Sequence, residues 1–568
     1  MQDQFIGYWG YGFPQELNTI LAKTTSEIGT KVLNLNQEDL VCGISYIGVK
    51  KVLLPRGENM IASISASGFS DRADAWVKLE NKQLILGREV FGRVPLYWAK
   101  IEQIIWFTSQ LKLLLPILSH PSVSIPGFYG YNCFSYVPTP LTPIENIFAL
   151  PAGTEQIFIN PETHSQKRYE WRENVVQIQD TNEAITQLQT LLKKAIQKQI
   201  VNLSSEPVGV FLSGGLDSST IAALLVQAGL KVRAYTLDFG KKFFPEWQYA
   251  EKVARYLDIP LVKISVTPNL IKNALLDTVK ALDLPFGDGV TVPLYLLCQT
   301  AAQEVSVIFN GEGGDQLFGG WTNKPIIAAA VYNNQENFTQ KYLQTFHRLC
   351  GYEQKIFQPE IYQVIQNISV AKWIESALDD TFCTGLIHKL RRATLMLKGA
   401  QNIHPRATNL AFAHGLFVRS PFCDLDLAEW TFQVPGEFNL KGSNEKYILK
   451  KAVESWLPPE VVWREKRGMG VPLTCWCLNE LWSEIRAWLN PEILEAEGRF
   501  ISDLAITIIQ GKLGGQIRSR RVGEILWLLM IWEIWRVTIL GESTISKSGY
   551  NPLWLPPWWW KWVEQIKN

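Results

Sequence analysis

The stretch Val208-Gly-Val-Phe-Leu-Ser-Gly-Gly-Leu-Asp-Ser-Ser219 decides the fold of this chain. An apolar strand ends at Leu212, two glycines permit backbone conformations closed to other residues, and small hydroxyl residues open a helix. Backbone N–H groups at such a helix start bind phosphate oxygens. The stretch therefore predicts an anion-binding loop, and the alternative is a strand-to-helix turn without a ligand. Its spacing matches neither G-x-x-x-x-G-K-[ST] nor G-x-G-x-x-G, which excludes those two nucleotide-binding classes.

Strands and helices alternate around this loop. We expect helices over 182–200, 218–228 and 247–257, and strands over 208–212, 232–237 and 261–266. This alternation predicts an α/β domain with a doubly wound parallel sheet. Residues 1 to about 175 instead contain short β segments separated by turns, which indicates a β-rich N-terminal domain. Beyond Ile326 the pattern is mainly helical up to about Thr538.

Composition narrows the class of protein. The chain has 568 residues, 47% of them hydrophobic, and 55 Lys+Arg balance 54 Asp+Glu. This balance excludes a disordered acidic chain and makes nucleic acid an unexpected partner. We find no signal or transit peptide in Met1 to Gly12 and no transmembrane segment, so the cytoplasm is the expected location. The 8 cysteines lack a paired CxxC, which supports neither disulfides nor a structural zinc site.

Two motifs carry a resemblance to a known family. Ser213-Gly-Gly-Leu-Asp-Ser218 resembles the signature of the ATP pyrophosphatase superfamily, whose members cleave ATP between the α and β phosphates. Val307-Ile-Phe-Asn-Gly-Glu-Gly-Gly-Asp-Gln-Leu-Phe-Gly-Gly320 is similar to the second motif of the asparagine synthetase family. Further matches to that family extend to about residue 540, and Gly87 to Tyr97 resembles its glutaminase-type domain. The resemblance implies a glutaminase-like domain at 1–180, an adenylating domain at 181–545 and a separate tail at 546–568.

The resemblance also implies which residues bind ATP and Mg²⁺. Asp217 and Asp315 match the family's metal-binding aspartates, and carboxylate oxygens suit this hard cation. For Asp217 alone, the alternative is a helix N-cap. The positions implied for nucleotide binding are Leu212, Ser213, Gly214, Gly215, Leu216, Asp217, Ser218, Ser219, Leu237 and Gly311.

Two catalytic residues follow from the same resemblance. Glu312 is the candidate base or positioning group for attack by an amine, and its alternative is a solvated loop carboxylate. Lys446 matches the family's active-site lysine, which stabilises charge in the transition state, and its alternative is a surface lysine. The basic residues Arg464, Lys466 and Arg467 are candidates for facing pyrophosphate, unless they form a solvated face.

The N-terminal domain departs from the glutaminase pattern. A working glutaminase of this type uses an N-terminal cysteine as nucleophile. Here Phe5-Ile-Gly-Tyr-Trp9 lies where that cysteine belongs, and Cys42 falls inside an expected strand, where we interpret it as a core thiol. The family's Asn-Gly-Glu segment is also missing. We therefore expect a catalytically silent scaffold.

The synthetase half departs from the pattern too. Thr408-Asn409 replaces the family's Asp-Arg pair, and Asp315-Gln316 replaces Asp-Glu, so we expect remodelled acyl and acceptor sites. Loss of glutaminase chemistry resembles β-lactam synthetases and lasso peptide cyclases, and the segment from Gly399 to Arg406 looks more like the cyclases. The implied function is an ATP-dependent ligase that adenylates a carboxylate and couples it to an amine.

The alternatives differ in substrate and in class. A lasso-type macrocyclase would act on a precursor peptide, with a protease or another maturation protein as a possible partner. The first alternative is an asparagine synthetase, either ammonia-dependent or glutamine-hydrolysing. The second is a non-catalytic nucleotide-binding scaffold.

Tryptophan is the unusual component, with 22 in the chain. Trp527, Trp532 and Trp535 recur at helical spacing and are expected in the core. The segment 551–562 is rich in Trp and Pro, and its prolines interrupt any long helix. We expect it either to pack onto an apolar groove or to present an aromatic surface to a partner protein or a membrane interface.

Overall fold

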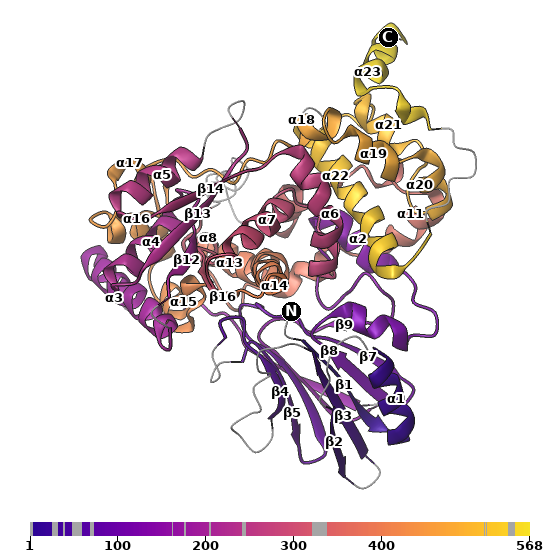
Figure 1. Ribbon diagram of the computed structural model, residues 1–568, viewed down its shortest axis with the longest axis horizontal. Helices are drawn as coiled ribbons and strands as arrows, with labels where there is room; N and C mark the ends of the chain where they lie inside the picture. The colour runs from indigo at the N-terminus through magenta and orange to yellow at the C-terminus, as the bar shows by residue number, and fades with distance from the viewer. Residues whose placement is uncertain are drawn as a thin grey trace.

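The computed structural model describes residues 4–24, 32–37, 40–47, 60–68, 73–161, 163–174, 178–203, 206–240, 246–320, 338–515, 517, 520–543 and 551–567. Three parts of the chain named above lie outside these residues. They are Met1 to Asp3, Ile326, beyond which helices were expected, and residues 546–550 of the tail. Figure 1 shows antiparallel sheets at the bottom, a parallel sheet to one side and a helical layer to the other.

Two antiparallel sheets form the N-terminal part. The first has the order β2-β3-β1-β8-β7-β9 and the second β11-β10-β6-β5-β4. The strands are β1 (Gln4–Tyr11), β2 (Val32–Gln37), β3 (Leu40–Ile47), β4 (Met60–Ile64), β5 (Ala75–Glu80), β6 (Gln83–Arg88), β7 (Tyr97–Ile101), β8 (Ile104–Thr108), β9 (Phe148–Ala149), β10 (Thr154–Asn160) and β11 (Thr163–Arg168). Helices η1 (Leu111–Ile117), α1 (Pro14–Thr24) and α2 (Ile125–Phe134) accompany them. The prediction of a β-rich domain is confirmed.

Strand β1 was not expected from the sequence. It pairs with β3 on one side and β8 on the other, and its residues from Gln4 to Gly10 are all buried. A strand buried on both faces lacks the alternation of polar and apolar residues by which strands are recognised. Its central place in the sheet therefore became visible only in three dimensions.

The predicted parallel sheet is confirmed. Its order is β14-β13-β12-β15-β16, and every neighbouring pair is parallel. The strands are β12 (Val208–Phe211), β13 (Val232–Asp238), β14 (Leu261–Ser265), β15 (Val307–Phe309) and β16 (Phe417–Arg419). The helices in this part are α3 (Thr181–Ile200), α4 (Leu216–Gln227), α5 (Trp247–Tyr256), α6 (Pro268–Leu282), α7 (Thr291–Ala301) and α8 (Gly314–Phe318). Helices flank the sheet on both faces (Figure 1).

The strand order reverses direction between β12 and β15, which are neighbours in the sheet but far apart in sequence. In open α/β sheets the crevice for a ligand opens beyond the carboxyl ends of the strands at such a switch point. The loop from Ser213 to Ser218, named the phosphate loop, follows β12. The part of the second motif from Asn310 to Gly320 follows β15. The topology therefore brings the two motifs to one edge of the sheet.

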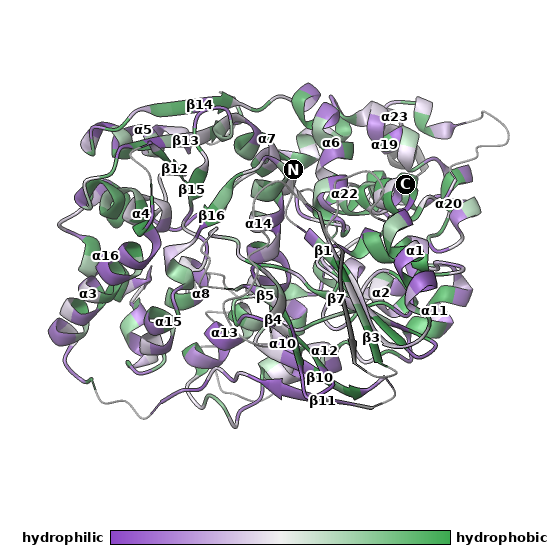
Figure 2. Cartoon of the chain, turned by 60° about the horizontal axis from the view of Figure 1, so that its bottom comes forward, coloured by the Kyte–Doolittle hydropathy of each residue, from purple (hydrophilic) through white to green (hydrophobic). Residues whose placement is uncertain are grey.

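The rest of the chain is mainly helical, as predicted. Figure 2 shows the central helix α22 largely in green, the colour of hydrophobic residues. The side chains of Trp527, Trp532 and Trp535 on this helix are fully buried, which confirms their place in the core. The elements are α10 (Phe338–Phe346), η2 (Glu353–Lys355), α11 (Pro359–Ile365), α12 (Ala371–Ile374), η3 (Glu375–Ala377), α13 (Leu386–Thr394), the π-helical η4 (Leu395–Ile403), α14 (His404–Ala413), η5 (Pro421–Cys423), α15 (Leu425–Thr431), η6 (Gly436–Asn439), β17 (Leu440–Lys441), β18 (Asn444–Glu445), α16 (Tyr447–Val453), α17 (Pro459–Val462), α18 (Leu473–Leu478), α19 (Trp482–Trp488), α20 (Pro491–Glu497), α21 (Leu504–Ile509), α22 (Arg520–Trp535), η7 (Arg536–Leu540), η8 (Pro552–Trp554) and α23 (Pro557–Lys567). No helix among these described residues is long and apolar enough to cross a membrane.

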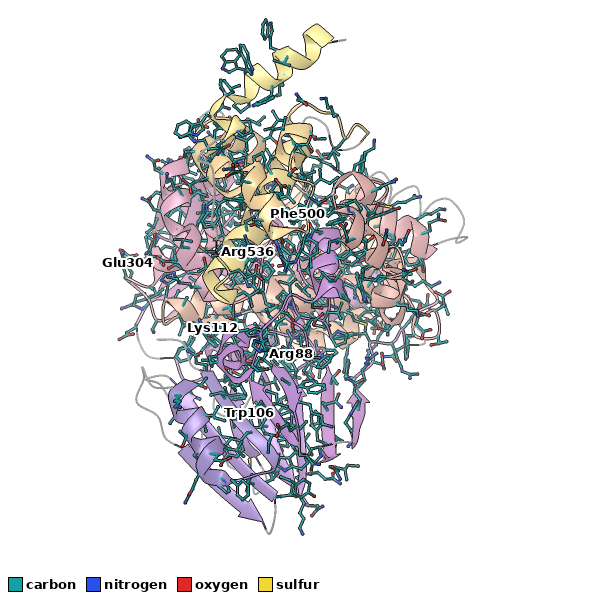
Figure 3. All side chains as sticks on the ribbon, turned by 90° about the vertical axis from the view of Figure 1, so that its right-hand side faces the viewer. Arg88, Trp106, Lys112, Glu304, Phe500 and Arg536 are labelled. Carbon is teal, nitrogen blue, oxygen red and sulfur yellow. The ribbon has the colours of Figure 1, made fainter. Side chains whose placement is uncertain are left out.

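A buried arginine joins the N-terminal sheets to the helical half. Arg88 lies at their junction in Figure 3 and is 3% exposed. Its guanidinium donates hydrogen bonds to four backbone oxygens, three within the N-terminal part and the fourth, at 3.0 Å, on Ala400 of η4. The His404 ring also lies 2.7 Å from the Phe91 carbonyl oxygen. The two parts therefore pack as one unit around η4.

Candidate active site

A cavity of about 440 Å³ opens at the carboxyl ends of β12 and β15. Residues from both motifs line it, together with α7, α14 and the loop 464–469. The predicted site residues that line it are Leu212, Ser213, Gly215, Asp217, Ser218, Leu237, Gly311, Glu312 and Asp315. The topology thus assembles most of the site that the sequence predicted.

Internal hydrogen bonds and close packing hold the phosphate loop in its conformation. Gly214 has φ +70°, and a Cβ at this position would lie 2.4 Å from the Ala250 nitrogen, so only glycine fits there. The Ser213 and Ser218 hydroxyl oxygens lie 3.1 Å apart, and the Gly215 N–H donates to Ser213 Oγ at 3.2 Å. Helix α4 begins after Gly215 without a side-chain cap. Its positive end therefore faces the cavity, which suits a phosphate group.

The two motifs touch through glycines. A Cβ on Gly311 would lie 2.7 Å from the Ser218 nitrogen, and a Cβ on Gly314 would lie 2.6 Å from Asp217 Cγ. Any larger side chain at either position would force the second motif away from α4. The glycine-rich character of the second motif is explained by this close approach.

Two lysines and two aspartates form an ion-pair cluster at the cavity. Lys446 Nζ lies 2.7 Å from Asp217 Oδ1 and 2.5 Å from Asp315 Oδ1. Lys466 Nζ lies 2.9 Å from Asp315 Oδ2. Lys446 is 1% exposed and has φ 54°, an unfavourable backbone conformation for a lysine. The interpretation of Lys446 as a surface lysine is therefore wrong.

The pKa values of this cluster follow from burial and charge. Burial by itself would raise the pKa of Asp315, but the ammonium groups of Lys446 and Lys466 outweigh it and hold that pKa well below its usual range. Burial likewise opposes the charge of Lys466, yet Asp315 and Asp217 raise the pKa of Lys466 above its ordinary value. The Asp315 carboxylate is thus ionised and Lys466 is protonated at neutral pH.

Glu312 differs from Asp315 in the direction in which its pKa is shifted. Burial raises its pKa, and the nearby charge of Arg406 only partly offsets this effect. A carboxylate whose pKa is raised toward neutrality is a better proton acceptor than a solvated one. Glu312 is partly buried in the cavity wall, which distinguishes it from a fully solvated loop carboxylate.

The donor set at the cavity fits a magnesium ion held partly by substrate. Asp217 and Asp315 offer two carboxylates that converge on one point, where the Lys446 ammonium lies. No group of three or more His, Cys, Asp or Glu side chains suited to a metal occurs among the described residues. Mg²⁺ is commonly held by one or two carboxylates plus the phosphates of a nucleotide, so a pair is sufficient.

Four predicted residues do not line the cavity. Leu216 and Ser219 are buried side chains of α4, Gly214 packs against Tyr249 and Ala250, and Lys446 is buried in contact with Asp217 and Asp315. Asp217 occupies the first turn of α4, whose N-cap is Gly215, so the N-cap interpretation of Asp217 is wrong.

The basic cluster faces the cavity. Arg464, Lys466 and Arg467 all line it, and the Arg464 guanidinium lies 4.3 Å from the centre of the Tyr249 ring. A purely solvated face is excluded for Lys466, because this side chain is 28% exposed and paired with Asp315. Glu246, from the start of α5, lines the same cavity and was not expected, since an isolated glutamate before a helix carries no signal in the sequence.

The other end of the cavity holds a second ion pair. Arg406 Nη1 lies 2.5 Å from Asp288 Oδ2, and the Thr291 hydroxyl donates to Asp288 Oδ1 at 2.6 Å. Lys398 of η4 is a further lining residue that the sequence did not reveal. Thr408 and Asn409, where the family pattern is broken, are buried in α14 and do not line this cavity. The apolar part of the wall includes Val290, Leu294, Leu297, Ile403, Ala407, Leu410 and Met469.

At the place of a glutaminase nucleophile, the described residues of the N-terminal part show a buried apolar side chain and a buried thiol. Phe5 is fully buried, and its N–H donates to Ser109 Oγ at 3.1 Å. Cys42 is 2% exposed in β3, and burial raises the pKa of its thiol to about 12. This confirms the interpretation of Cys42 as a core thiol. A separate cavity of about 630 Å³ lies at the junction with the helical half, lined by Trp76, Phe91 and Arg93 among others.

The chain is similar to known proteins along most of its length. The family model described as asparagine synthase matches residues 187–536, and a glutamine amidotransferase domain model matches residues 74–170. The asparagine synthetase [glutamine-hydrolyzing] 1 of Bacillus subtilis (strain 168) is 24% identical over 488 residues, which cover 80% of this chain and 76% of that protein. A putative asparagine synthetase [glutamine-hydrolyzing] of Mycobacterium bovis is 22% identical over 82% of this chain and 76% of its own length.

The matched range contains both motifs and every residue of the ion-pair cluster. The cavity, the phosphate loop, the paired aspartates and the buried lysine thus coincide with the part of the chain that the family model covers. The chain belongs to the asparagine synthase family and is an ATP-dependent carbon–nitrogen ligase of that type.

Proposed function

We propose that this ligase adenylates a carboxylate and couples it to an amine without hydrolysing glutamine, and that its reaction is a lasso-type macrocyclisation of a precursor peptide. The observation that carries the proposal is the contrast between an intact cluster of Asp217, Asp315 and Lys446 and a buried Phe5 where a glutaminase nucleophile belongs. With ammonia from glutamine absent, the amine must come from another molecule or from the substrate itself.

In the first half-reaction, an oxygen of the substrate carboxylate attacks the α-phosphorus of ATP. The bond from this phosphorus to the β-phosphate oxygen breaks, which yields an acyl-adenylate and pyrophosphate. Ser213, Ser218 and the start of α4 would hold the phosphates. Lys466 and Lys446 would stabilise the negative charge that grows on them.

Asp217 and Asp315 would hold Mg²⁺, which when bound neutralises phosphate charge during the transfer. In this arrangement the Lys446 ammonium balances the second charge of the pair. Without that lysine, the two carboxylates would repel each other in a poorly solvated site.

In the second half-reaction, the amine nitrogen attacks the acyl carbon. The bond from this carbon to the AMP oxygen breaks, AMP leaves, and a proton passes from the nitrogen to Glu312. The raised pKa of Glu312 supports this role, because the group accepts a proton more readily than an exposed carboxylate does.

Asparagine synthesis from aspartate is the second candidate. It is favoured by the names of the similar proteins, which are asparagine synthetases described as glutamine-hydrolyzing. A non-catalytic scaffold is disfavoured, because a protein that only binds a nucleotide has no need for the buried Lys446 or the Glu312 environment.

Pyrophosphate release, measured together with the coupled product, separates these candidates. The chain is incubated with ATP, Mg²⁺ and either aspartate with ammonium or peptides bearing an internal Asp or Glu. A peptide product lighter by one water supports the macrocyclase, whereas asparagine supports the second candidate. Formation of glutamate from glutamine would overturn the silent glutaminase, and no release with any carboxylate would support the scaffold.

Asp217→Asn tests the site directly. Release should fall by about 10³-fold, because the variant removes one carboxylate from the metal site. Asp426→Asn is the control, since its carboxylate pairs with Lys198 at 2.8 Å outside the cavity. Undiminished release in Asp217→Asn would remove the metal assignment.

A further inference from the structure

The Trp-rich segment 551–567 is anchored at its first residues. Leu553 is fully buried, and Asn551 Nδ2 donates to the Arg486 carbonyl oxygen at 2.7 Å. The Trp560 side chain packs against the main hydrophobic core. The expectation of packing onto the body is therefore confirmed for these residues.

The rest of the segment turns outward. Trp554 and Trp558 are each 65% exposed, Trp562 is 48% exposed and Leu555 is 41% exposed. Trp558 and Trp562 lie one turn apart on the same face of α23. Trp559 lies between them, with its ring centre 5.1 Å from that of Trp562. Trp554, Leu555, Trp558, Trp559 and Trp562 are together named the aromatic ridge, since four of the five are tryptophans and the rings of Trp558, Trp559 and Trp562 are in contact.

We propose that this aromatic ridge docks onto the surface of a lipid membrane that contains anionic headgroups. Figure 3 shows α23 at the top of the molecule, with side chains projecting away from the body. An indole combines an apolar body with a polar N–H, and tryptophan is accordingly enriched at the level of lipid headgroups. The ridge is therefore chemically suited to the membrane interface.

The ridge is large for an exposed apolar patch on a single chain. Its four most exposed side chains present roughly 500 Å² of apolar surface, taking about 250 Å² for a whole tryptophan side chain. A patch of that size on a monomer is commonly functional.

Positive charge accompanies the ridge. Lys561 is exposed and lies between Trp558 and Trp562 in the sequence. The Arg486 guanidinium lies 4.0 Å from the centre of the Trp554 ring, at the foot of the ridge. Cationic groups beside an apolar face draw a helix to anionic lipid, because the surface potential of such a membrane is negative.

Docking would leave the cavity accessible. In Figure 1, α23 projects from the top of the helical layer, while β12 and α4 lie on the opposite side of the molecule. None of the ridge residues lines the cavity. Membrane binding and pyrophosphate release are therefore separable by mutation, and the proposal does not depend on the identity of the acyl substrate.

Flotation of the full chain with vesicles tests the proposal. The vesicles are made of phosphatidylcholine alone or of equal parts phosphatidylcholine and phosphatidylglycerol. We expect the wild-type chain to float with the mixed vesicles, and Trp554→Ser/Trp558→Ser/Trp562→Ser to lower the bound fraction at least about tenfold. Lys561→Gln should lower binding to the mixed vesicles about fivefold and leave binding to phosphatidylcholine alone unchanged.

The matched control removes exposed apolar side chains elsewhere. Phe13, Tyr256 and Val364 are 75%, 56% and 49% exposed, and their combined replacement by serine should leave flotation unchanged. An unchanged thermal unfolding midpoint in the ridge variant shows that it is folded. Failure of the wild-type chain to float with either vesicle, or equal flotation of the ridge variant, overturns the proposal. A dimer in size exclusion that the ridge variant converts to a monomer, without flotation of either, would assign the ridge to a second copy instead.

Discussion

The N-terminal sheets and the parallel-sheet domain differ in the side chains that each of them brings together. The parallel-sheet domain brings charged groups together at one edge, where Lys446 lies between Asp217 and Asp315. The N-terminal part keeps two antiparallel sheets, but Phe5 and Cys42 are buried and present no nucleophile. Both parts therefore have well-formed sheets, whereas the cluster of charged side chains lies in the parallel-sheet domain.

The difference shows what the N-terminal sheets contribute. Arg88 reaches from β6 to the carbonyl of Ala400 in η4, and Lys398 on the same π-helical segment lines the cavity. The N-terminal part thus supports a wall of the cavity. This contact gives the sheets a structural role that does not depend on glutaminase chemistry.

The largest effect should come from the charged cluster. Lys446→Met removes the ammonium that lies between Asp217 and Asp315 and leaves Lys466 paired with Asp315, so pyrophosphate release should fall about 10²–10³-fold. A coupled assay for pyrophosphate measures this. Lys451→Met, on the same helix but paired with the exposed Glu454, is the control. If Lys446→Met releases pyrophosphate at the wild-type rate, the charged cluster does not distinguish the parallel-sheet domain from the N-terminal sheets in function.

The second largest effect should come from removing the contact of Arg88 between the N-terminal sheets and η4. Arg88→Met leaves four backbone carbonyls without their donor, and the free energy of unfolding should fall by about 3 kcal/mol. Denaturant titration measures the loss, with Arg168→Met at the exposed end of β11 as control. If the two variants are equally stable, the N-terminal sheets do not support η4 through Arg88.

The amide-forming step should depend on Glu312. Glu312→Gln removes the proton acceptor and should slow product formation about 10²-fold while adenylation continues. Only the ionised carboxylate accepts a proton, so the wild-type rate should rise as pH passes upward through the raised pKa of Glu312. The rate of the variant should lack this rise. Product and pyrophosphate are measured together across pH, and a variant with the wild-type pH profile would exclude Glu312 as the base.

The smallest effect belongs to Cys42. Cys42→Ala removes a buried sulfur atom and should lower the free energy of unfolding by about 1 kcal/mol. Pyrophosphate release should not change, and neither protein should form glutamate from glutamine. A thermal unfolding scan and a glutamate assay check both expectations. Glutamate formation that is lost in Cys42→Ala would make this thiol a nucleophile after all.

The sequence predicted the α/β alternation well, because its strands and helices have strong local patterns. It did not predict β1, since a fully buried strand carries no alternation. In the site, Asp217, Glu312 and Asp315 were recognisable because they belong to two local motifs. Glu246 and Lys398 were not, because each is an ordinary charged residue until the chain folds around the cavity.

The sequence by itself determined the phosphate loop, the paired motifs and the absence of a cysteine before Cys42, because these depend only on residue type and local spacing. Tertiary structure alone decided that Lys446 is buried between two aspartates, one of them 229 residues away along the chain. It also decided which tryptophans are core and which form the aromatic ridge. Burial and long-range ion pairs arise from packing, and packing joins residues whose proximity no local pattern encodes.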